Sequence, residues 1–198
     1  LNPHYACINV PAQPWLHLAT LFSRTVVFFT KPDEVQSLAF SGLCPAVTIE
    51  CGKAGEEHNK EHARRFVEGA LHLAHFPVHP LPESDYDLYH TVAIVKVSPG
   101  IDFSFSDESA DLRFPDDLDH MNFRELPAGT RIAWVSGKGL QLEAWNEAGE
   151  NLADHYFEQQ NGTLSTRLPV MPSMLTLNEE VIRQDCLCYL MERMPPLA

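Results

Sequence analysis

The chain has 198 residues, of which 44% are hydrophobic and 21% are charged, a composition typical of a globular protein with a substantial core. Its 14 Lys and Arg residues against 27 Asp and Glu residues give a net charge of -13, which repels phosphate backbones and excludes nucleic acid as a partner. No apolar run approaches the roughly 20 residues that a membrane helix needs, so the sequence predicts a soluble protein without a membrane partner.

Five cysteines are scattered along the chain without the paired spacings of a zinc ribbon or a disulfide framework. We therefore expect buried, reduced thiols in a cytoplasmic protein. Two of them are separated by one residue, so a strand would place both thiols on one face, where packing is favoured over binding of a soft metal. The cysteines are Cys7, Cys44, Cys51, Cys186 and Cys188.

The first third of the chain alternates short apolar runs with helical patterns, which is typical of an α/β unit with a largely buried sheet. A long amphipathic helix follows, because Ala63, Phe66, Ala70 and neighbouring apolar residues recur at helical spacing. The two shorter helices each have a proline near the start. Strands are predicted over residues 5–10, 25–29 and 46–51, and helices over residues 14–22, 32–40 and 56–75.

Prolines at 77, 80 and 82 predict a boundary between a domain of residues 1–80 and a small β-rich domain of residues 81–198. The acidic stretch 107–119 lacks the ligand spacing of a calcium loop and is interpreted as a solvated surface loop. Beyond the boundary the hydrophobic pattern has a period of two. Strands are predicted over residues 90–97, 102–105, 131–135 and 140–145, and a closing helix or strand over residues 179–194.

The most informative segment is the apolar run that ends in Glu50, followed by Gly52 and Lys53. A buried strand rarely ends in a carboxylate, because removing the charge from water costs several kcal/mol unless a partner compensates. Gly52 would allow a sharp turn or a close approach of a ligand. A catalytic carboxylate and a structural ion pair both remain open on these residues alone.

Several segments carry a resemblance to a known family. The run Thr48-Ile49-Glu50-Cys51-Gly52-Lys53, with the long helix after it, resembles the strand that ends in the essential glutamate of the succinylglutamate desuccinylase/aspartoacylase family. Asn2-Pro3-His4-Tyr5 resembles the segment just after that family's third zinc ligand. Tyr156-Phe157-Glu158 and Leu175-Thr176-Leu177-Asn178 resemble blocks of its C-terminal β domain.

The resemblance implies part of a zinc carboxypeptidase-like α/β domain joined to a small β domain. It implies a zinc-dependent hydrolase that cleaves the amide bond of an N-acyl amino acid, with Glu50 as general base and general acid. His4, Lys53 and Tyr156 become the candidate substrate-binding residues. The family's zinc ligands, two His and one Glu, would lie upstream of Leu1, so no residue of this chain is assigned to the metal. The 198 residues alone are then expected to be inactive, and a homo-oligomer is possible.

Two departures bear on the substrate. The aspartoacylase branch of the family has a substrate-binding arginine about ten residues before its essential glutamate, where this chain has Phe40. A tyrosine of that branch corresponds to Phe157, next to Tyr156. Without the bidentate carboxylate fork of the arginine, N-acetylaspartate is not the expected substrate.

Other interpretations stay open. His58-Asn59-Lys60-Glu61-His62 spells the inverted zinc-protease signature, but solvated imidazoles on a polar helix are the favoured interpretation. His4 is either a substrate ligand or a structural residue at a strand start, and Lys53 either binds an acidic substrate or pairs with Glu56. For the whole chain, the alternatives are a noncatalytic binding module built from residues 83–198 and a zinc carboxypeptidase that acts on peptides.

Overall fold

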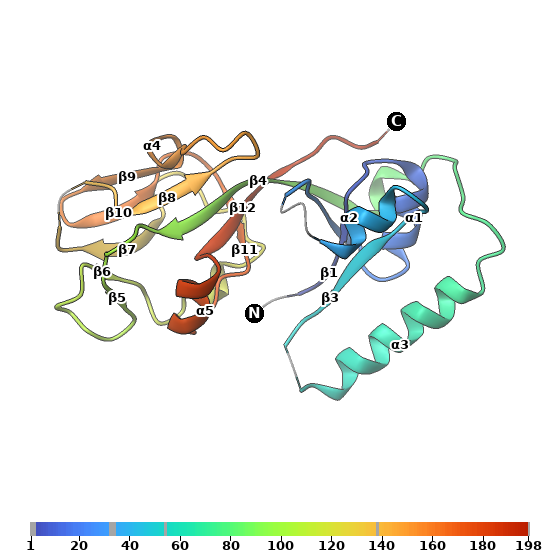
Figure 1. The fold of residues 1–198 in the computed structure, drawn as a ribbon, viewed down its shortest axis with the longest axis horizontal. Coiled ribbons are helices and arrows are strands. Elements are labelled where there is room, and N and C mark those ends of the chain that lie inside the picture. The colour runs from blue at the N-terminus through green and yellow to red at the C-terminus, as the bar shows by residue number, and fades with distance from the viewer. Residues whose placement is uncertain (1–2, 32–34, 54, 138, 198) are drawn as a thin grey trace. The chain divides into compact units, whose positions relative to one another are not determined.

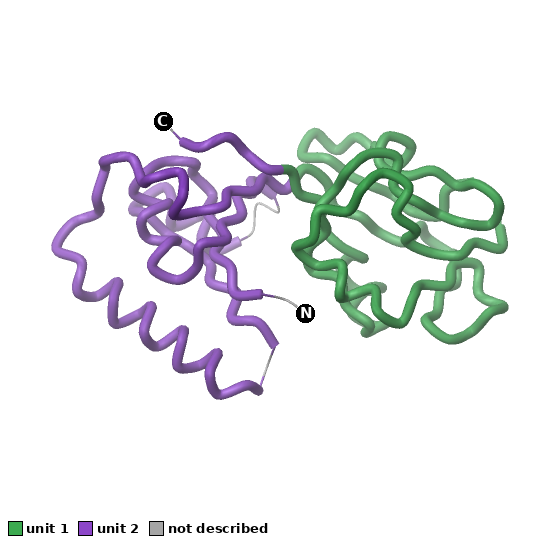
Figure 2. The backbone as a smooth tube through the Cα atoms, turned by 180° about the vertical axis from the view of Figure 1, so that it is seen from behind, with its two compact units in different colours: residues 1–2, 92–192 green, residues 3–91, 193–198 purple. Residues whose placement is uncertain are grey.

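The structure is a computed structural model that describes residues 3–31, 35–53, 55–137 and 139–197. The chain divides into two compact units, shown in different colours in Figure 2. We call residues 3–91 with 193–197 the α/β unit and residues 92–192 the β unit. The division differs from the predicted boundary after residue 80, because strand β4 (Asp87–Val97) begins in the first unit and ends in the second. The fold class is α/β, as expected.

The sheet of the α/β unit has the order β3–β1–β2–β4. β1 is parallel to β2, and β2 is parallel to the first residues of β4, whereas β3 runs antiparallel to β1. All five residues of β3 are half-buried, so the expectation of a fully buried strand at Glu50 is wrong. The three predicted strands are confirmed as β1 (His4–Ile8), β2 (Thr25–Phe28) and β3 (Val47–Cys51).

In the described part of this unit, the helices α1, α2 and α3 accompany the sheet (Figure 1). Pro14 lies in the first turn of α1, where its missing N–H leaves no hydrogen bond unmade. The predicted helix over 32–40 is shorter at its start, and its residues 32–34 lie outside the described part. Among the described residues, no helix is long and apolar enough to cross a membrane. The helices are α1 (Gln13–Thr20), α2 (Gln36–Ser41) and α3 (Glu57–Leu71).

The core of the α/β unit lies on one face of its sheet. Ala6 and Ile8 of β1 and Val26 of β2 contact Leu16, Ala19 and Phe22 from α1 and the turn after it. Of α3, only Asn59 is fully buried, while Phe66 packs at the edge of this core. Val67 and Leu71, apolar residues next to Phe66 and Ala70 in the predicted amphipathic pattern, are 50% and 80% exposed.

The β unit contains a five-stranded sheet in the order β5–β6–β7–β10–β9. The end of β4 pairs with β8 (Leu142–Trp145), and β11 (Met171–Ser173) pairs with β12 (Cys188–Arg193). The closing segment 179–194 holds both predicted elements, first helix α5 (Glu179–Gln184) and then β12. The other elements are β5 (Phe103–Ser104), β6 (Leu112–Arg113), β7 (Arg131–Val135), α4 (Ala153–Tyr156), β9 (Phe157–Gln160) and β10 (Thr163–Thr166).

One sequence-based expectation for the β unit changes, and the expectation for its cysteines is met. The acidic stretch 107–119 is more than a solvated loop, because Leu112, Phe114 and Leu118 are fully buried between its exposed carboxylates. Cys186 and Cys188 are buried as packing thiols, and burial raises the pKa of Cys186 to about 12. In the α/β unit, by contrast, Cys44 is exposed, so buried thiols do not account for every cysteine.

Candidate functional site

Glu50 is the penultimate residue of β3, and the main chain turns directly after the strand. Gly52 has a φ of 75°, in the left-handed region that glycine adopts without strain, as its position after the strand predicted. The antiparallel register pairs Glu50 with Tyr5 and Cys51 with His4. Because β3 is antiparallel to β1, the C-terminal end of β3 lies at the edge where β1 begins.

The register also decides which side chains share a face. Directly paired residues point to the same side of a sheet, and successive residues alternate. Glu50 therefore shares a face with Tyr5 and Cys7, and Cys7 has its pKa raised by burial and, in smaller part, by the Glu50 charge. His4 points to the opposite face, where its ring lies 5.7 Å from that of Phe22. This geometry separates His4 from Glu50 and favours the structural alternative for His4.

The Glu50 carboxylate is half-buried, and burial raises its pKa above the ordinary value. Among the described residues, none donates a hydrogen bond to this carboxylate or forms an ion pair with it. A carboxylate desolvated without a compensating cation holds its proton more tightly than usual, and such groups are concentrated at functional sites. Of the two interpretations of Glu50, the structural ion pair has no support in the described part of the chain.

Asn59 fixes the turn after Glu50 and was not singled out in the sequence. Its side chain is buried on α3, where Oδ1 accepts a hydrogen bond from His4 Nε2 at 2.7 Å. Its Nδ2 donates to the carbonyl oxygen of Lys53 at 2.7 Å and to Glu56 Oε2 at 3.3 Å. One amide thus joins the start of β1, the turn after β3 and the first turn of α3. A polar residue at a core-facing helix position was the available signal.

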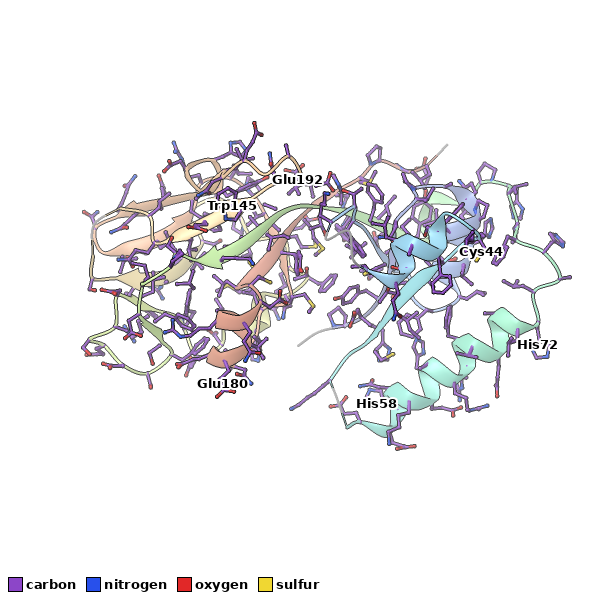
Figure 3. The ribbon with its side chains drawn as sticks, in the orientation of Figure 1. Cys44, His58, His72, Trp145, Glu180 and Glu192 are labelled. Atoms are coloured by element: carbon purple, nitrogen blue, oxygen red, sulfur yellow. The ribbon has the colours of Figure 1, made fainter. Side chains whose placement is uncertain are left out.

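The histidines of the zinc-protease signature lie beside His4. The His62 ring stacks on His4, with centroids 4.5 Å apart and planes at 15°, and His62 Nε2 donates to the Phe22 carbonyl at 2.7 Å. His58, labelled in Figure 3, lies in the first turn of α3 and is exposed, with its Nε2 atom 3.5 Å from Glu56 Oε2. The expected solvated imidazoles are thus correct for His58 and wrong for His62.

Zinc is the metal that the family resemblance implies. Nε2 of His4 and Nε2 of His62 already donate hydrogen bonds to oxygen atoms. Across the ranges that the structure describes, no group of three or more His, Cys, Asp and Glu side chains could hold a metal ion. The described residues therefore do not fit a zinc site.

The other predicted substrate residues lie in different places. Lys53 is exposed just beyond β3, and its ammonium group has no ion pair among the described residues, since Glu56 instead contacts His58 and Asn59. Tyr156 belongs to the β unit, where it is 4% exposed, and burial followed by the Glu192 charge raises its pKa. The structure thus places Lys53 in the same unit as Glu50 and Tyr156 in the other.

The two positions that depart from the aspartoacylase branch also lie in different units. Phe40 is 56% exposed on α2, in the α/β unit. Phe157 is 2% exposed and packs in the core of the β unit.

Comparison with solved structures identifies the fold. A succinylglutamate desuccinylase from Chromobacterium violaceum matches all of this chain and 52% of its own, with a TM-score of 0.53 at 16% identity. The chain has the fold of part of a succinylglutamate desuccinylase. The desuccinylase from Vibrio parahaemolyticus matches 98% of this chain and 51% of its own, with a TM-score of 0.54 at 13% identity.

A second kind of enzyme shares this desuccinylase fold. Murine aminoacylase 3 matches 98% of this chain and 59% of its own, with a TM-score of 0.53 at 11% identity. The chain therefore spans between half and three fifths of the length of these structures. No family model and no curated protein matches the sequence of this chain. At these identities the likeness concerns the fold alone.

Proposed function

We propose that this chain is part of a hydrolase that cleaves the amide bond of an N-acyl amino acid, with Glu50 as general base and general acid. The observation that carries the proposal is the half-buried Glu50 carboxylate, which ends β3 with a raised pKa and no described ion pair. The fold of the chain, which succinylglutamate desuccinylases and an aminoacylase share, also supports the proposal. A general base with a pKa closer to neutral transfers protons more effectively near physiological pH.

The proposed chemistry for Glu50 has two steps. As a carboxylate, it accepts a proton from the water that attacks the acyl carbonyl. As a carboxylic acid, it gives that proton to the amine that leaves when the C–N bond breaks. Lys53, exposed after the Gly52 turn, supplies a cation for a substrate carboxylate.

Zinc dependence belongs to the same proposal, by analogy with the family that the sequence resembles. By that analogy the zinc ligands would come from a segment outside these 198 residues, and the described residues do not form a zinc site of their own. Atomic analysis of zinc after exchange into metal-free buffer tests this part. Zinc bound by the longest natural form and absent from the 198-residue chain is the expected result, whereas stoichiometric zinc in the 198-residue chain contradicts it.

The test of Glu50 is the substitution Glu50→Gln in the longest natural form of the protein. We expect turnover of N-succinylglutamate or another N-acyl amino acid to fall by about 10²–10⁴-fold, the range for loss of a general base. The matched control is Glu57→Gln, which removes an exposed carboxylate paired with Lys60 at 2.9 Å and leaves turnover within about twofold. Retained turnover in Glu50→Gln would contradict the assignment of Glu50 as general base and general acid.

The substrate class is tested in the same assay. The proposal predicts release of free amino acid from N-acyl amino acids and much slower release from a dipeptide with a free amino terminus. Faster cleavage of peptides would instead support the carboxypeptidase alternative. No turnover of either class by the longest natural form, with zinc bound, would favour the noncatalytic alternative.

A further inference from the structure

A tryptophan on the five-stranded sheet of the β unit lies between two arginines. The Arg113 guanidinium carbon lies 4.0 Å from the centroid of the Trp134 ring, and that of Arg131 lies 4.2 Å from it. Arg113 and Trp134 are directly paired across β6 and β7, labelled in Figure 1, so they share a face. Both distances are well within the range of a cation–π contact.

A β-bulge brings Arg131 to the same face. Residues three apart in a regular strand point to opposite sides, so Arg131 and Trp134 would normally be separated by the sheet. Between β7 and β10 the register shifts, since Leu164 pairs with Ala133 whereas Ser165 pairs with Arg131. Ile132 and Ala133 are consecutive and both buried in the core. The extra residue thus turns Arg131 outward beside Trp134, and bulges commonly re-aim side chains at functional positions.

The two guanidinium groups have no acidic partner among the described residues. Among the described residues, neither Arg113 nor Arg131 forms an ion pair or donates a hydrogen bond. Other arginines of this acidic chain do have carboxylate partners: Arg24 pairs with Asp87, Arg64 with Glu61, and Arg183 with Asp102. Stacking on an indole uses only the flat face of a guanidinium, so its N–H groups at the edge remain available to an anion.

The other residues that pair along this outer face are polar. Thr163 pairs with Trp134, and Ser165 pairs with Arg131, so hydroxyl groups follow the arginines along β10. Carboxylates lie at two margins of this face. Glu158 is on β9, with β10 between it and β7, and accepts a hydrogen bond from Gln160. Glu179 accepts a hydrogen bond from Ser104, the residue paired with Arg113. The surface therefore combines two cations, an aromatic ring and a row of hydroxyls on an extended strand surface.

We propose that this surface, formed by Arg113, Arg131 and Trp134 and called here the Arg–Trp surface, binds an acidic, extended segment of a partner protein. Carboxylates of such a segment accept hydrogen bonds from the guanidinium edges, and its apolar atoms cover the indole. A nucleic acid is disfavoured because two arginines do not form the basic stripe that tracks a phosphate backbone. The proposal concerns the β unit and stands whether or not Glu50 is catalytic.

The test uses the 198-residue chain and a fluorescein-labelled hexaglutamate peptide, with binding measured by fluorescence polarisation at low salt. We expect binding that Arg113→Gln with Arg131→Gln weakens at least tenfold. The matched control is Arg124→Gln, which removes the charge of another exposed arginine of the β unit and should change the affinity by less than twofold. Replacing both stacked arginines by Lys keeps the charge but removes the planar fork, and should still weaken binding at least threefold.

Four results would overturn the proposal. These are absence of hexaglutamate binding, an equal loss in the Arg124→Gln control, full affinity in the double Lys variant, and tighter binding of a single-stranded DNA hexamer than of hexaglutamate. Circular dichroism of each variant shows whether the β unit is folded. If the double Gln variant is unfolded, the folded single variants Arg113→Gln and Arg131→Gln decide, each with at least a threefold loss expected.

Discussion

The α/β unit and the β unit differ in how completely they bury their apolar side chains. In the β unit, Phe103, Phe114 and Leu164 are at most 2% exposed, and they belong to one large continuous core. In the α/β unit, Leu43, Leu71 and other large apolar residues are exposed, and β3 is half-buried along its whole length. The candidate catalytic carboxylate is on this less completely packed unit.

This difference in burial indicates which interactions stabilise each unit. A closed core gives the β unit its own source of stability, since burial of apolar surface is the main favourable term in folding. The α/β unit relies more on polar connections, such as the Asn59 amide that joins β1, α3 and the turn after Glu50. Substitutions in the two units should therefore have different consequences.

The largest effect is expected for Phe114→Ala in the β unit. Phe114 is fully buried, and its ring lies 5.7 Å from that of Phe103 and 5.8 Å from that of Phe105. We expect a loss of about 3–5 kcal/mol in the free energy of unfolding, measured by urea denaturation. The control is Phe40→Ala in the α/β unit, where the 56% exposed ring should contribute less than about 0.5 kcal/mol. Similar losses from both substitutions would contradict the contrast.

The next largest loss of stability is expected when either of two buried asparagines is replaced by alanine. Asn59→Ala in the α/β unit leaves the Lys53 carbonyl and His4 without their partner, and should cost about 1–3 kcal/mol. Asn122→Ala in the β unit breaks two 2.8 Å hydrogen bonds with the main chain of Leu175 and should cost a similar amount. The two substitutions should differ in their effect on the turnover rate of the longest natural form. Only Asn59→Ala should lower it, because only Asn59 fixes the turn that follows Glu50.

Much of the fold follows from the sequence. The short apolar runs and the helical patterns predicted β1, β2, β3, α1 and α3, because each element shows a hydrophobic pattern of its own. The strands missed in the β unit, β6, β9, β10 and β11, have at most four residues each. Their positions depend on pairing between distant segments, which no local pattern encodes.

The candidate site was less predictable. Glu50 followed from a carboxylate at the end of an apolar run, and Gly52 from the turn that such a position needs. The opposite orientations of His4 and Glu50 depend on the register of β1 and β3, and a shift of one residue would reverse the face. The role of Asn59 depends on where α3 packs, and the pairing of Trp134 with Arg131 depends on a bulge that the strand pattern conceals.

A smaller effect is expected when Glu50→Gln is studied for stability. The pKa of Glu50 is higher in the folded state than in the unfolded state, so the folded state binds more protons between the two pKa values. Stability contributed by the protonated group is therefore lost as pH rises from the ordinary value of 4.5 through the folded pKa. The substitution should stabilise the 198-residue chain at pH 7, by less than about 1 kcal/mol because the group is partly solvated, and should have little effect at pH 4.

The measurement is thermal unfolding at both pH values, with Glu57→Gln as the exposed carboxylate control. A gain in midpoint at pH 7 of roughly 1–3 °C is expected for Glu50→Gln alone. A loss of stability at pH 7 would mean that a cation compensates Glu50 in the folded protein, which would restore the ion-pair interpretation.

The smallest effect tests whether the exposed apolar residues of the α/β unit are exposed in the longest natural form as well. Leu71 is 80% exposed at the end of α3, so Leu71→Ala in the 198-residue chain should change the free energy of unfolding by less than about 0.5 kcal/mol. If further chain covers this side chain, the same substitution in the longest natural form should cost about 2–5 kcal/mol. Equal small effects in both forms would mean that α3 presents a free apolar surface, and the contrast between the two units would then be a property of the whole protein.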